Sequence, residues 1–534
     1  MPDETQRQAE RERPPRIAIL GAGPAGLAAG YFLKRHGYKD VMIFEKLGRV
    51  GGLCKSVTDG YMAFDLGGTY ITPAYHETLK IARVVRAERY RGKSYEMVKV
   101  VKDDQGKKSL KRDDAWGYAR RGLGDQAEPI GIVQLVRGVF AFWWQRRKVR
   151  RYVDTPSFER VHERKDLCVS FGAWLDSHDI GFMRRLFEIP VTMMGYGFLD
   201  EVAAPYVLKY MAPGTYWSMF LRGLPFVGLF WAWPQRFREG FQRMWERVSW
   251  GLNVRMDVRV LGVRRQERRE LPIELDVETA DHLYPHEEGR TRRTLCFDKL
   301  ILACPLTREV LEQFIALRDD EAVLFERIHA HTYVQNTLHA VTVDSTTGEE
   351  KPFKLFAPVV PVFPFDETTF GKPWVVVQVW GNQSRLLQFY SRIDPEGRDA
   401  RSIRTDVEAA SHELLHLLKD SDTCATPVEA GSIPGHERLQ RWSTYDRWPY
   451  FSHVSAEDMA GGFFSRLDAI QSIQNTYYTG GAATFEMVEA VVRHAKYIAE
   501  KVHRDLRKEA FPKPRRVPFG MLHPPYAEAE RLVE

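Results

Sequence analysis

A glycine-rich turn near the start of the chain has the spacing of a dinucleotide-binding site. The sequence Gly21-Ala-Gly-Pro-Ala-Gly26 follows a short apolar run and precedes a segment with helical spacing. In such a turn Gly21 permits the tight bend, Gly23 lets the backbone approach a pyrophosphate, and Gly26 lets helix and strand pack closely. The N-terminus of the helix then offers free N–H groups and the positive end of its dipole to the phosphates.

An acidic residue stands where such a site needs a partner for the ribose. The apolar run Val41-Met-Ile-Phe44 predicts a second buried strand, which ends at Glu45, nineteen residues beyond Gly26. A carboxylate at this place accepts hydrogen bonds from ribose hydroxyls and disfavours a 2′-phosphate. A lone glycine motif also occurs in turns with a purely structural role, but strand, helix and Glu45 in register favour the dinucleotide site.

Two further glycine pairs favour a flavin dinucleotide over a nicotinamide one. They stand in Arg49-Val-Gly-Gly52 and in Phe64-Asp-Leu-Gly-Gly-Thr69. Because glycine has no Cβ, the main chain there can lie flat against the dinucleotide and against the isoalloxazine ring. Two ordinary turns are the alternative explanation.

These motifs together resemble a known superfamily of flavoproteins. The run from Arg16 to Cys54 and the segment Asp65–Gly68 are similar to the FAD-dependent amine oxidase and phytoene desaturase superfamily. Two other stretches resemble, within it, the bacterial polyenoic fatty acid isomerases. They are Gly195-Tyr-Gly197 followed by Ala204–Tyr210, and Tyr450–Asp458 running on to Asn475–Gly480.

The resemblance implies that FAD is the cofactor. No cysteine stands in the C-terminal flavin segment, so we expect the FAD to be bound non-covalently. In one respect the chain departs from the superfamily: an acidic residue that contacts the ribitol usually follows Gly480, whereas here that position is Gly481. The residues expected to bind FAD are Gly21, Gly23, Ala25, Gly26, Glu45, Lys46, Gly52, Leu53, Gly67, Gly68, Thr69, Val258, Gly480, Gly481 and Val488.

Later segments offer further strands and a last helix for the same domain. Leu252–Val260 alternates like a strand, and Phe297–Pro305 reads as a buried strand that ends at a proline. Thr476–Gly481 leads into a helix expected from about residue 485 to 502. By the resemblance, the backbone from Val258 to Val260 meets the adenine side of FAD.

We expect an α/β fold with a Rossmann-like FAD-binding domain built from discontinuous segments, a mixed-sheet substrate domain and a helical insert. The strand-like runs 332–338 and 374–380 suit a sheet that roofs the flavin. The expected parts are a charged flexible arm at 1–15, the FAD-binding domain at 16–85, 246–309 and 441–508, a helical substrate- or membrane-facing insert at 86–245, the substrate-domain sheet at 310–440, and a proline-rich tail at 509–534.

The resemblance implies a reaction on a lipophilic substrate, with a fatty acid as the expected one. A hydride leaves the bis-allylic carbon of a polyunsaturated chain for flavin N5 and returns two carbons away, which shifts a double bond. Aromatic faces stabilise the intervening cation, so Tyr196 and Phe451 are the candidate catalytic residues. Trp231 and Trp233 are expected to line the channel, and Arg91 is the arginine expected to bind the substrate carboxylate.

Two other functions stay open. One is a net flavin-dependent oxidase or desaturase of a lipophilic amine or polyene. The other is a non-catalytic, membrane-associated flavoprotein scaffold, a possibility raised by Gly481 and by two apolar segments. Product analysis separates the first from isomerisation, and flavin content decides the second.

The two apolar segments also raise the question of membrane contact. Residues 129–144 carry a single charge, Arg137, and are followed by Arg146, Arg147, Lys148, Arg150 and Arg151; residues 218–233 carry only Arg222. In the first segment one helical stripe holds Ile132, Val136, Val139, Phe140 and Trp143, with Leu135, Phe142 and Trp144 opposite. A helix at an anionic lipid surface and a core helix with a solvated basic end both fit, and we expect peripheral contact through 129–151 and 218–233.

Composition narrows the remaining classes. The 534 residues carry 77 Lys+Arg and 71 Asp+Glu, a net charge of +6 that is too weak to indicate a nucleic-acid ligand. Five cysteines without a C-x-x-C pair speak against a disulfide framework and against a zinc site, and no metal is expected. We expect a cytoplasmic protein, with contact to the inner face of the membrane as its peripheral association.

Overall fold

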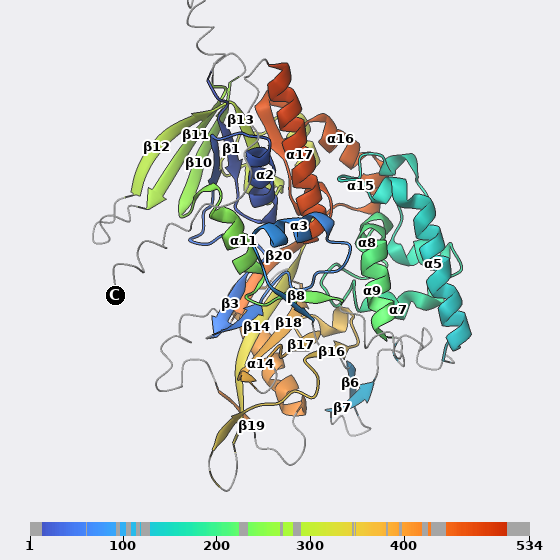
Figure 1. Cartoon of the computed structure of the whole chain (residues 1–534). Coiled ribbons are helices and arrows are strands. Elements are labelled where there is room, and N and C mark those ends of the chain that lie inside the picture. Colours follow the sequence, from blue (N-terminus) through green and yellow to red (C-terminus); the bar gives the residue numbers. More distant parts are fainter. Residues whose placement is uncertain are drawn as a thin grey trace, which may run out of the picture.

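The structure is a computed structural model, shown in Figure 1. The residues that it describes are 13–59, 61–91, 97–102, 108–113, 118, 129–223, 233–266, 271–280, 290–343, 347, 349–380, 383–394, 398–418, 425–428 and 445–509. Statements below concern these residues. The predicted arm and the predicted tail therefore lie outside the described residues, apart from 13–15 and 509.

Five parallel strands from distant parts of the chain form the first sheet. In spatial order they are β21 (Thr476–Tyr478), β13 (Lys299–Leu302), β1 (Ile17–Leu20), β2 (Val41–Phe44) and β9 (Asn253–Arg255). All residues of β1, β13 and β21 are buried, which is why these runs lack polar alternation. The predicted Rossmann-like domain is thus assembled from three separate segments.

Helices cover one face of this sheet, and a small antiparallel sheet lies on its other side (Figure 1). The helices are α2 (Pro24–Arg35), α3 (His76–Val84), α11 (Phe241–Ser249) and α17 (Val488–Lys508), with α2 and α17 packed together. The small sheet has the order β10 (Val258–Arg265), β11 (Ile273–Ala280) and β12 (Arg290–Phe297).

The expected single strand at 252–260 is two strands. β9 ends at Arg255, and β10 begins at Val258 in a different sheet. Between them Asp257 has a φ of 56°, in the left-handed region that interrupts an extended strand. The alternation of apolar residues therefore runs across a sharp bend that the sequence pattern did not indicate.

A second, larger sheet lies below the first one in Figure 1. Its long central strand β14 (His329–Val343) pairs antiparallel with β18 (Leu386–Ile393) on one side and with β20 (Tyr445–His453) on the other. β20 comes from the stretch assigned to the FAD-binding domain, so residues 445–453 contribute to the other sheet instead. The remaining strands are β6 (Met97–Lys102), β7 (Lys108–Asp113), β15 (Glu350–Pro352), β16 (Val359–Phe363), β17 (Val375–Val377) and β19 (Ala425–Val428), and α14 (Ala400–Leu418) packs against this sheet.

The third part is a layer of helices at one side of the molecule (Figure 1). Its helices are α5 (Ile132–Val153), α6 (Phe171–Asp176), α7 (Arg184–Glu188), α8 (Ala204–Tyr210) and α9 (Pro213–Gly223). The stretch 86–245 is not wholly helical, because it also supplies β6, β7 and the two-stranded ribbon of β5 (Arg89–Arg91) and β8 (Gln235–Phe237).

Short elements complete the described chain. They are β3 (Ser56–Asp59), β4 (Met62–Asp65), α12 (Arg308–Leu311), α13 (Asp319–Phe325), α15 (Ala456–Ala460), α16 (Phe463–Ala469) and the 3₁₀ turns η1 (Val161–Glu163), η2 (Gly181–Met183), η3 (Glu367–Thr369), η6 (Ile473–Asn475) and η7 (Gly481–Ala483). The predicted fold class, with a discontinuous Rossmann-like domain, a mixed sheet and a helical part, is confirmed. Among the described helices, none has the length and apolarity needed to cross a bilayer.

Helix α5 differs from the expectation in which side is buried. Leu135, Val139 and Phe142 are buried and Trp143 is partly buried, whereas Trp144 is exposed together with Ile132, Val136 and Phe140. Arg146 does not belong to the surface basic cluster: it is 2% exposed, its Nε donates to Leu208 O at 3.0 Å, and it pairs with Asp154. The exposed basic residues of α5 are Arg137, Arg147, Lys148, Arg150 and Arg151.

Candidate active site

The first glycine turn is sterically closed to any other residue at two of its positions. Gly21 has a φ of +106°, and a Cβ there would lie 2.7 Å from Ala303 O. A Cβ on Gly26 would lie 1.9 Å from Gly21 O, so this glycine lets α2 start directly against the end of β1. Gly23 is different, because its nearest neighbour for a Cβ is Gly52 Cα at 3.7 Å, an ordinary contact. Gly23 is therefore free to serve a ligand rather than the fold.

The start of α2 leaves backbone donors available. Gly23 is the N-cap in an extended conformation, Pro24 occupies the first turn, and no side chain caps the helix. The early N–H groups of a helix have no partner within the helix. Ala25 and Gly26 thus lie where such groups, with the positive end of the helix dipole, can face a phosphate.

The second and third glycine pairs pack onto this turn. Gly51 N donates to Ala22 O at 2.9 Å, and a Cβ on Gly52 would lie 3.0 Å from Gly23 Cα. A Cβ on Gly67 would lie 1.8 Å from Leu53 O, so the third pair is held against the second. The glycine turn at 21–26 and the glycine pairs at 51–52 and 67–68 therefore pack on one another, and these residues together are named the glycine crevice.

Glu45 lies at the end of β2 beside the crevice. Its carboxylate is buried and accepts hydrogen bonds from Ala22 N (2.8 Å) and Leu47 N (3.0 Å). Each carboxylate oxygen accepts one of these bonds and keeps further acceptor capacity. Val258 N donates to Glu45 O at 2.9 Å, so Val258 lies next to Glu45. Lys46 follows Glu45 and is exposed.

The opposite end of the crevice meets the start of α17. A Cβ on Gly68 would lie 3.2 Å from Cys54 Sγ and 3.7 Å from Val488 Cγ2, so residues 420 positions apart in the chain are in contact range. Thr69 Oγ1 donates to Gly67 O at 2.9 Å and fixes this loop. Gly480, with a φ of +135°, leads from β21 into η7 and on to α17.

Glu486 is a site residue that the sequence did not reveal. A Cβ built on Gly481 would lie 3.1 Å from both Cβ and Cγ of Glu486, so the Glu486 side chain fills the space beside that glycine. Its carboxyl accepts a hydrogen bond from Ser452 N at 2.6 Å. Burial raises the pKa of Glu486 to about 7, although the backbone hydrogen bonds from Ser452 and Phe451 oppose the shift.

One face of the second sheet closes the crevice. Cross-strand pairing places Gln335 opposite both Tyr390 and Asp446, and paired residues project to the same face. Tyr390 Oη and Gln388 Nε2 both donate to Asp65 O, at 3.0 and 3.2 Å, and so bind the sheet to the strand that precedes Gly67. Lys55 reaches Asp446 across the same junction at 2.6 Å.

Several buried polar atoms on this sheet have no protein partner among the described residues. On the face that holds Gln335 they are Gln335 Oε1, Gln388 Oε1 and Asp446 Oδ2. Buried polar atoms without a hydrogen bond are unfavourable and rare in native proteins. A crevice that excludes Cβ atoms and a wall with unsatisfied polar atoms fit a bound dinucleotide, so the chain's residues are compatible with FAD.

The two candidate catalytic residues belong to one buried aromatic cluster. The Tyr196 ring centre lies 5.3 Å from that of Phe451, 5.7 Å from Tyr450 and 4.9 Å from Phe485. Tyr196 Oη donates to Glu486 O at 3.4 Å, next to the start of α17. Phe451 has a φ of 56°, a strained value that persists only where the surroundings enforce it.

No buried residue of this cluster is poised as a charged nucleophile. Burial raises the pKa of Tyr196 to about 12 and keeps its phenol neutral. Burial also raises the pKa of the Cys54 thiol beside Gly68 and lowers the pKa of His453. His453 Nδ1 is bonded to Phe451 O at 2.7 Å, which is a structural role. Within the described residues the histidine, cysteine and acidic side chains form no group suited to a metal ion.

The expected substrate residues are only partly gathered here. Arg91 is exposed on β5, and Trp233 is half-buried with the Arg89 guanidinium 5.7 Å from its ring centre. Trp231 lies outside the described residues. Arg236, which the sequence gave no sign of, is the buried cation of this ribbon: Nη2 donates to Tyr70 Oη at 2.6 Å.

The N-terminal part of the chain is similar in sequence to known proteins. A family model described as an NAD(P)-binding Rossmann-like domain matches residues 19–86. The polyenoic fatty acid isomerase of Ptilota filicina is 46% identical over 59 residues, which are 11% of this chain and 12% of that protein. The chain therefore aligns with about an eighth of the length of this relative.

Solved structures match over nearly the whole chain. The CLA-producing fatty acid isomerase from P. acnes superposes on this chain with a TM-score of 0.65 at 21% sequence identity. The superposition covers 91% of this chain and 98% of the isomerase chain. Cyclohexylamine oxidase from Brevibacterium oxydans has a TM-score of 0.56 at 15% identity, covering 93% and 100%. These likenesses show that the chain shares the fold of these two enzymes. The predicted resemblance to the amine oxidase superfamily and to fatty acid isomerases is confirmed at the level of the fold and of the N-terminal segment.

Proposed function

We propose that this chain is an FAD-dependent enzyme that isomerises double bonds in a polyunsaturated fatty acid. The observation that carries the proposal is the position of the aromatic cluster. Tyr196 contacts the backbone of Glu486, and the chain from Glu486 leads directly into Val488, where the glycine crevice ends. The named isomerases among the similar proteins support this choice of reaction.

The crevice residues would hold FAD as the sequence predicted. Ala25 and Gly26 would offer N–H groups to the pyrophosphate, Glu45 would accept from the ribose, and Gly67 and Gly68 would lie against the ring end. Bound there, FAD supplies the ability to accept a hydride and to give it back.

The protein's own part is to bind the acyl chain, exclude water and stabilise positive charge. The cluster around Tyr196 and Phe451 offers ring faces to a delocalised cation, an interaction of about 0.5–2 kcal/mol for each well-placed ring. Because the phenols stay neutral and the Cys54 thiol stays protonated, these groups do not trap the cation as a covalent adduct. Such a cycle needs no side-chain base.

Product analysis under air tests the reaction. Linoleate labelled with deuterium at its bis-allylic carbon should give a conjugated isomer of unchanged mass, with the label moved and without hydrogen peroxide. A product three mass units lighter, which has lost one deuteride and one proton, or peroxide formed in proportion to product, would exclude the redox-neutral reaction.

A net oxidase of a lipophilic amine or polyene is the alternative that the fold favours. Its support is the similarity of the fold to that of cyclohexylamine oxidase, with a TM-score of 0.56. For this alternative, oxygen consumption with a lipophilic amine should match product formation.

A non-catalytic scaffold is the third possibility, because Gly481 lacks the expected acid. Flavin content tests it. Purified protein that stays colourless after incubation with FAD would favour the scaffold, whereas stoichiometric FAD would exclude this reason for proposing it.

A further inference from the structure

Arg236 is a buried cation without a carboxylate partner among the described residues. Its side chain lies on β8 and is 5% exposed. Its Nη2 donates a hydrogen bond to Tyr70 Oη, and the guanidinium carbon also lies 4.4 Å from the centre of the Tyr70 ring. A buried charge is unfavourable unless it is paired, so this arrangement suits a site that an anion completes.

The other groups around Arg236 do not neutralise it. Tyr90 of β5 and Tyr390 of β18 are both close enough to interact with it electrostatically. Asp65 interacts with Arg236 electrostatically, but its Oδ1 already accepts from Ser56 Oγ (2.6 Å) and Phe241 N (2.7 Å). Among the described residues no ion pair joins the Asp65 carboxyl to the guanidinium, whose hydrogen bond is to Tyr70.

A row of tyrosine rings leads from Arg236 to the reaction cluster. Ring centres are 6.3 Å apart between Tyr390 and Tyr333, 5.6 Å between Tyr333 and Tyr450, and 5.7 Å between Tyr450 and Tyr196. All these rings are largely buried, and the row ends at Tyr196. A cation at one end and an aromatic path from it match a ligand with an anionic head and a long apolar chain.

We propose that Arg236 binds the carboxylate of a long-chain monocarboxylic substrate whose chain runs along these tyrosines. A guanidinium binds a carboxylate through two parallel hydrogen bonds, which fixes the direction of the chain. This places the head group on the inner residue of the ribbon rather than on exposed Arg91; the two strands pair Tyr90 with Arg236 and Arg91 with Gln235.

Calorimetric titration of the FAD-loaded protein with dodecanoate and with dodecan-1-ol tests the assignment. The wild type should bind the carboxylate at least tenfold more tightly than the alcohol. Arg236→Met should lose this preference, Arg236→Lys should keep part of it, and the matched variant Arg91→Met should keep it all. Tyr70→Phe, which removes one bond to the guanidinium and keeps the ring, serves if Arg236→Met does not fold, and it should change the preference less than tenfold.

Equal binding of the two ligands by the wild type would overturn the assignment, as would a full preference in folded Arg236→Lys and Arg236→Met or a loss in Arg91→Met. The assignment of Arg236 rests on the proposed function, and different results test the assignment and the reaction. Conjugated product formed without any carboxylate preference would leave the reaction standing and remove Arg236. A carboxylate preference together with peroxide formation would support the role of Arg236 and exclude the redox-neutral reaction.

An independent feature is the apolar outer face of α5. Five large apolar side chains of this helix are 45–67% exposed: Ile132, Val133, Val136, Phe140 and Trp144. Their spacing of three to four residues places them on one side of the helix. The opposite side, with Leu135 and Phe142, is buried in the main core.

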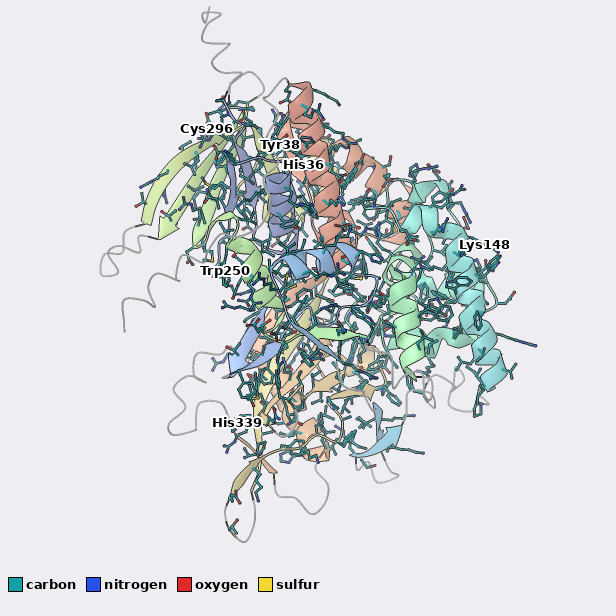
Figure 2. All side chains as sticks on the ribbon, viewed as in Figure 1. His36, Tyr38, Lys148, Trp250, Cys296 and His339 are labelled. Carbon is teal, nitrogen blue, oxygen red and sulfur yellow. The ribbon has the colours of Figure 1, made fainter. Side chains whose placement is uncertain are left out.

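The same face ends in a basic cluster, defined as Arg147, Lys148, Arg150 and Arg151. All four are exposed, and no acidic side chain of the described residues forms an ion pair with them. Lys148 lies at the outer edge of the molecule in Figure 2. The Arg147 guanidinium lies 5.7 Å from the Trp143 ring, at the boundary between the apolar and basic parts.

We infer that this face of α5 rests on an anionic lipid surface. Apolar and aromatic side chains enter the interface of a bilayer while adjacent Lys and Arg bind its acidic head groups, so one partner matches both parts of the face. The buried side of α5 contacts α8 through Arg146 Nε and Leu208 O, and Tyr210 of α8 lies 5.4 Å from Tyr196. A lipophilic substrate taken from the bilayer would thus enter one helix away from the reaction cluster.

Flotation with vesicles of phosphatidylcholine containing 30% phosphatidylglycerol tests this surface, with pure phosphatidylcholine as the comparison. The wild type should float with the anionic vesicles and lose binding in 0.5 M salt. Arg147→Gln/Lys148→Gln/Arg150→Gln and Phe140→Ser/Trp144→Ser should each bind at least tenfold more weakly. The control Arg238→Gln/Lys351→Gln/Lys508→Gln removes the same charge from exposed bases elsewhere and should bind as the wild type does.

Three outcomes would overturn the lipid assignment. The wild type could ignore anionic vesicles, or the control could lose as much binding as the α5 variants. In the third, size-exclusion with light scattering would show a wild-type dimer that Phe140→Ser/Trp144→Ser converts to a monomer, which would mean that a second copy of the chain covers this face.

Discussion

The side chain of Glu486 occupies the space that a side chain at Gly481 would need. Cβ, Cγ and Cδ of Glu486 all lie 3.1–3.2 Å from the position of a Cβ on Gly481. The superfamily resemblance places an acidic residue at 481, and here a buried carboxyl reaches the same place from five residues later in the chain. Flavin binding therefore need not suffer from the absence of the acid at 481.

This exchange of positions predicts a compensating pair of substitutions. Gly481→Glu alone should crowd Glu486 and lower both FAD occupancy and thermal stability. Gly481→Glu/Glu486→Gly should recover most of both, because one carboxyl then occupies the site. Flavin absorbance and melting temperatures of the two single variants and the double variant form the cycle. Additive losses in the double variant would show that the two positions do not share one space.

The raised pKa of Glu486 predicts a pH dependence of stability. An acid with a folded pKa of about 7 and an ordinary value of 4.5 holds its proton longer when folded. Its contribution therefore falls as pH rises from about 4.5 to about 7, by up to about 3 kcal/mol. Urea unfolding of the apoprotein should show the wild type losing stability relative to Glu486→Gln across this window. Asp65, with a pKa raised to about 6, acts in the same direction and remains in both proteins.

The glycines of the first turn predict two different failures. Gly23→Val should leave a folded protein that does not bind FAD, because a Cβ there meets only an ordinary contact in the protein while it blocks the pyrophosphate. Gly26→Val should fail to fold, because its Cβ would lie 1.9 Å from Gly21 O. Circular dichroism and flavin absorbance separate the two outcomes. Full flavin occupancy in Gly23→Val would contradict the phosphate assignment.

Local signals in the sequence predicted the strands and the helix that flank the first glycine turn. The turn from Gly21 to Gly26 lies between a strand and a helix that are each encoded by adjacent residues, and Glu45 ends the next strand. The glycine pairs at 51–52 and 67–68 can also be predicted, because the sequence itself shows where the chain has no side chain. What the sequence could not show is that these turns stack on one another, because that depends on contacts such as Leu53 O with Gly67.

Residues that depend on distant partners were missed or misplaced. Arg236 is buried because Tyr70 and Tyr90 surround it, and Glu486 matters because of Ser452 and Tyr196. Arg146 was grouped with its basic neighbours, although Leu208 and Asp154 hold it inside. Periodicity could not choose which side of α5 faces the core, since both sides are apolar.

The position of Arg146 predicts a contrast with its neighbour. Arg146→Met should destabilise the protein by about 2–4 kcal/mol, because it leaves Leu208 O and the Asp154 carboxylate without their donor. Arg147→Met, on the exposed side, should change stability by less than about 0.5 kcal/mol. Urea unfolding of both variants measures the difference. Equal effects would place Arg146 at the surface.

The aromatic cluster predicts a selective loss of turnover. Tyr196→Leu removes a ring face from the path of the proposed cation and should lower kcat by about 3–30-fold, the equivalent of about 0.5–2 kcal/mol, with little change in KM. Tyr196→Phe keeps the ring and removes only the bond to Glu486 O, so it should retain most of the activity. Steady-state kinetics with melting temperatures as a folding control distinguish the two variants. If Tyr196→Leu raises KM and leaves kcat unchanged, Tyr196 shapes the channel without stabilising charge, because a group that binds the substrate and the transition state equally changes KM and not kcat.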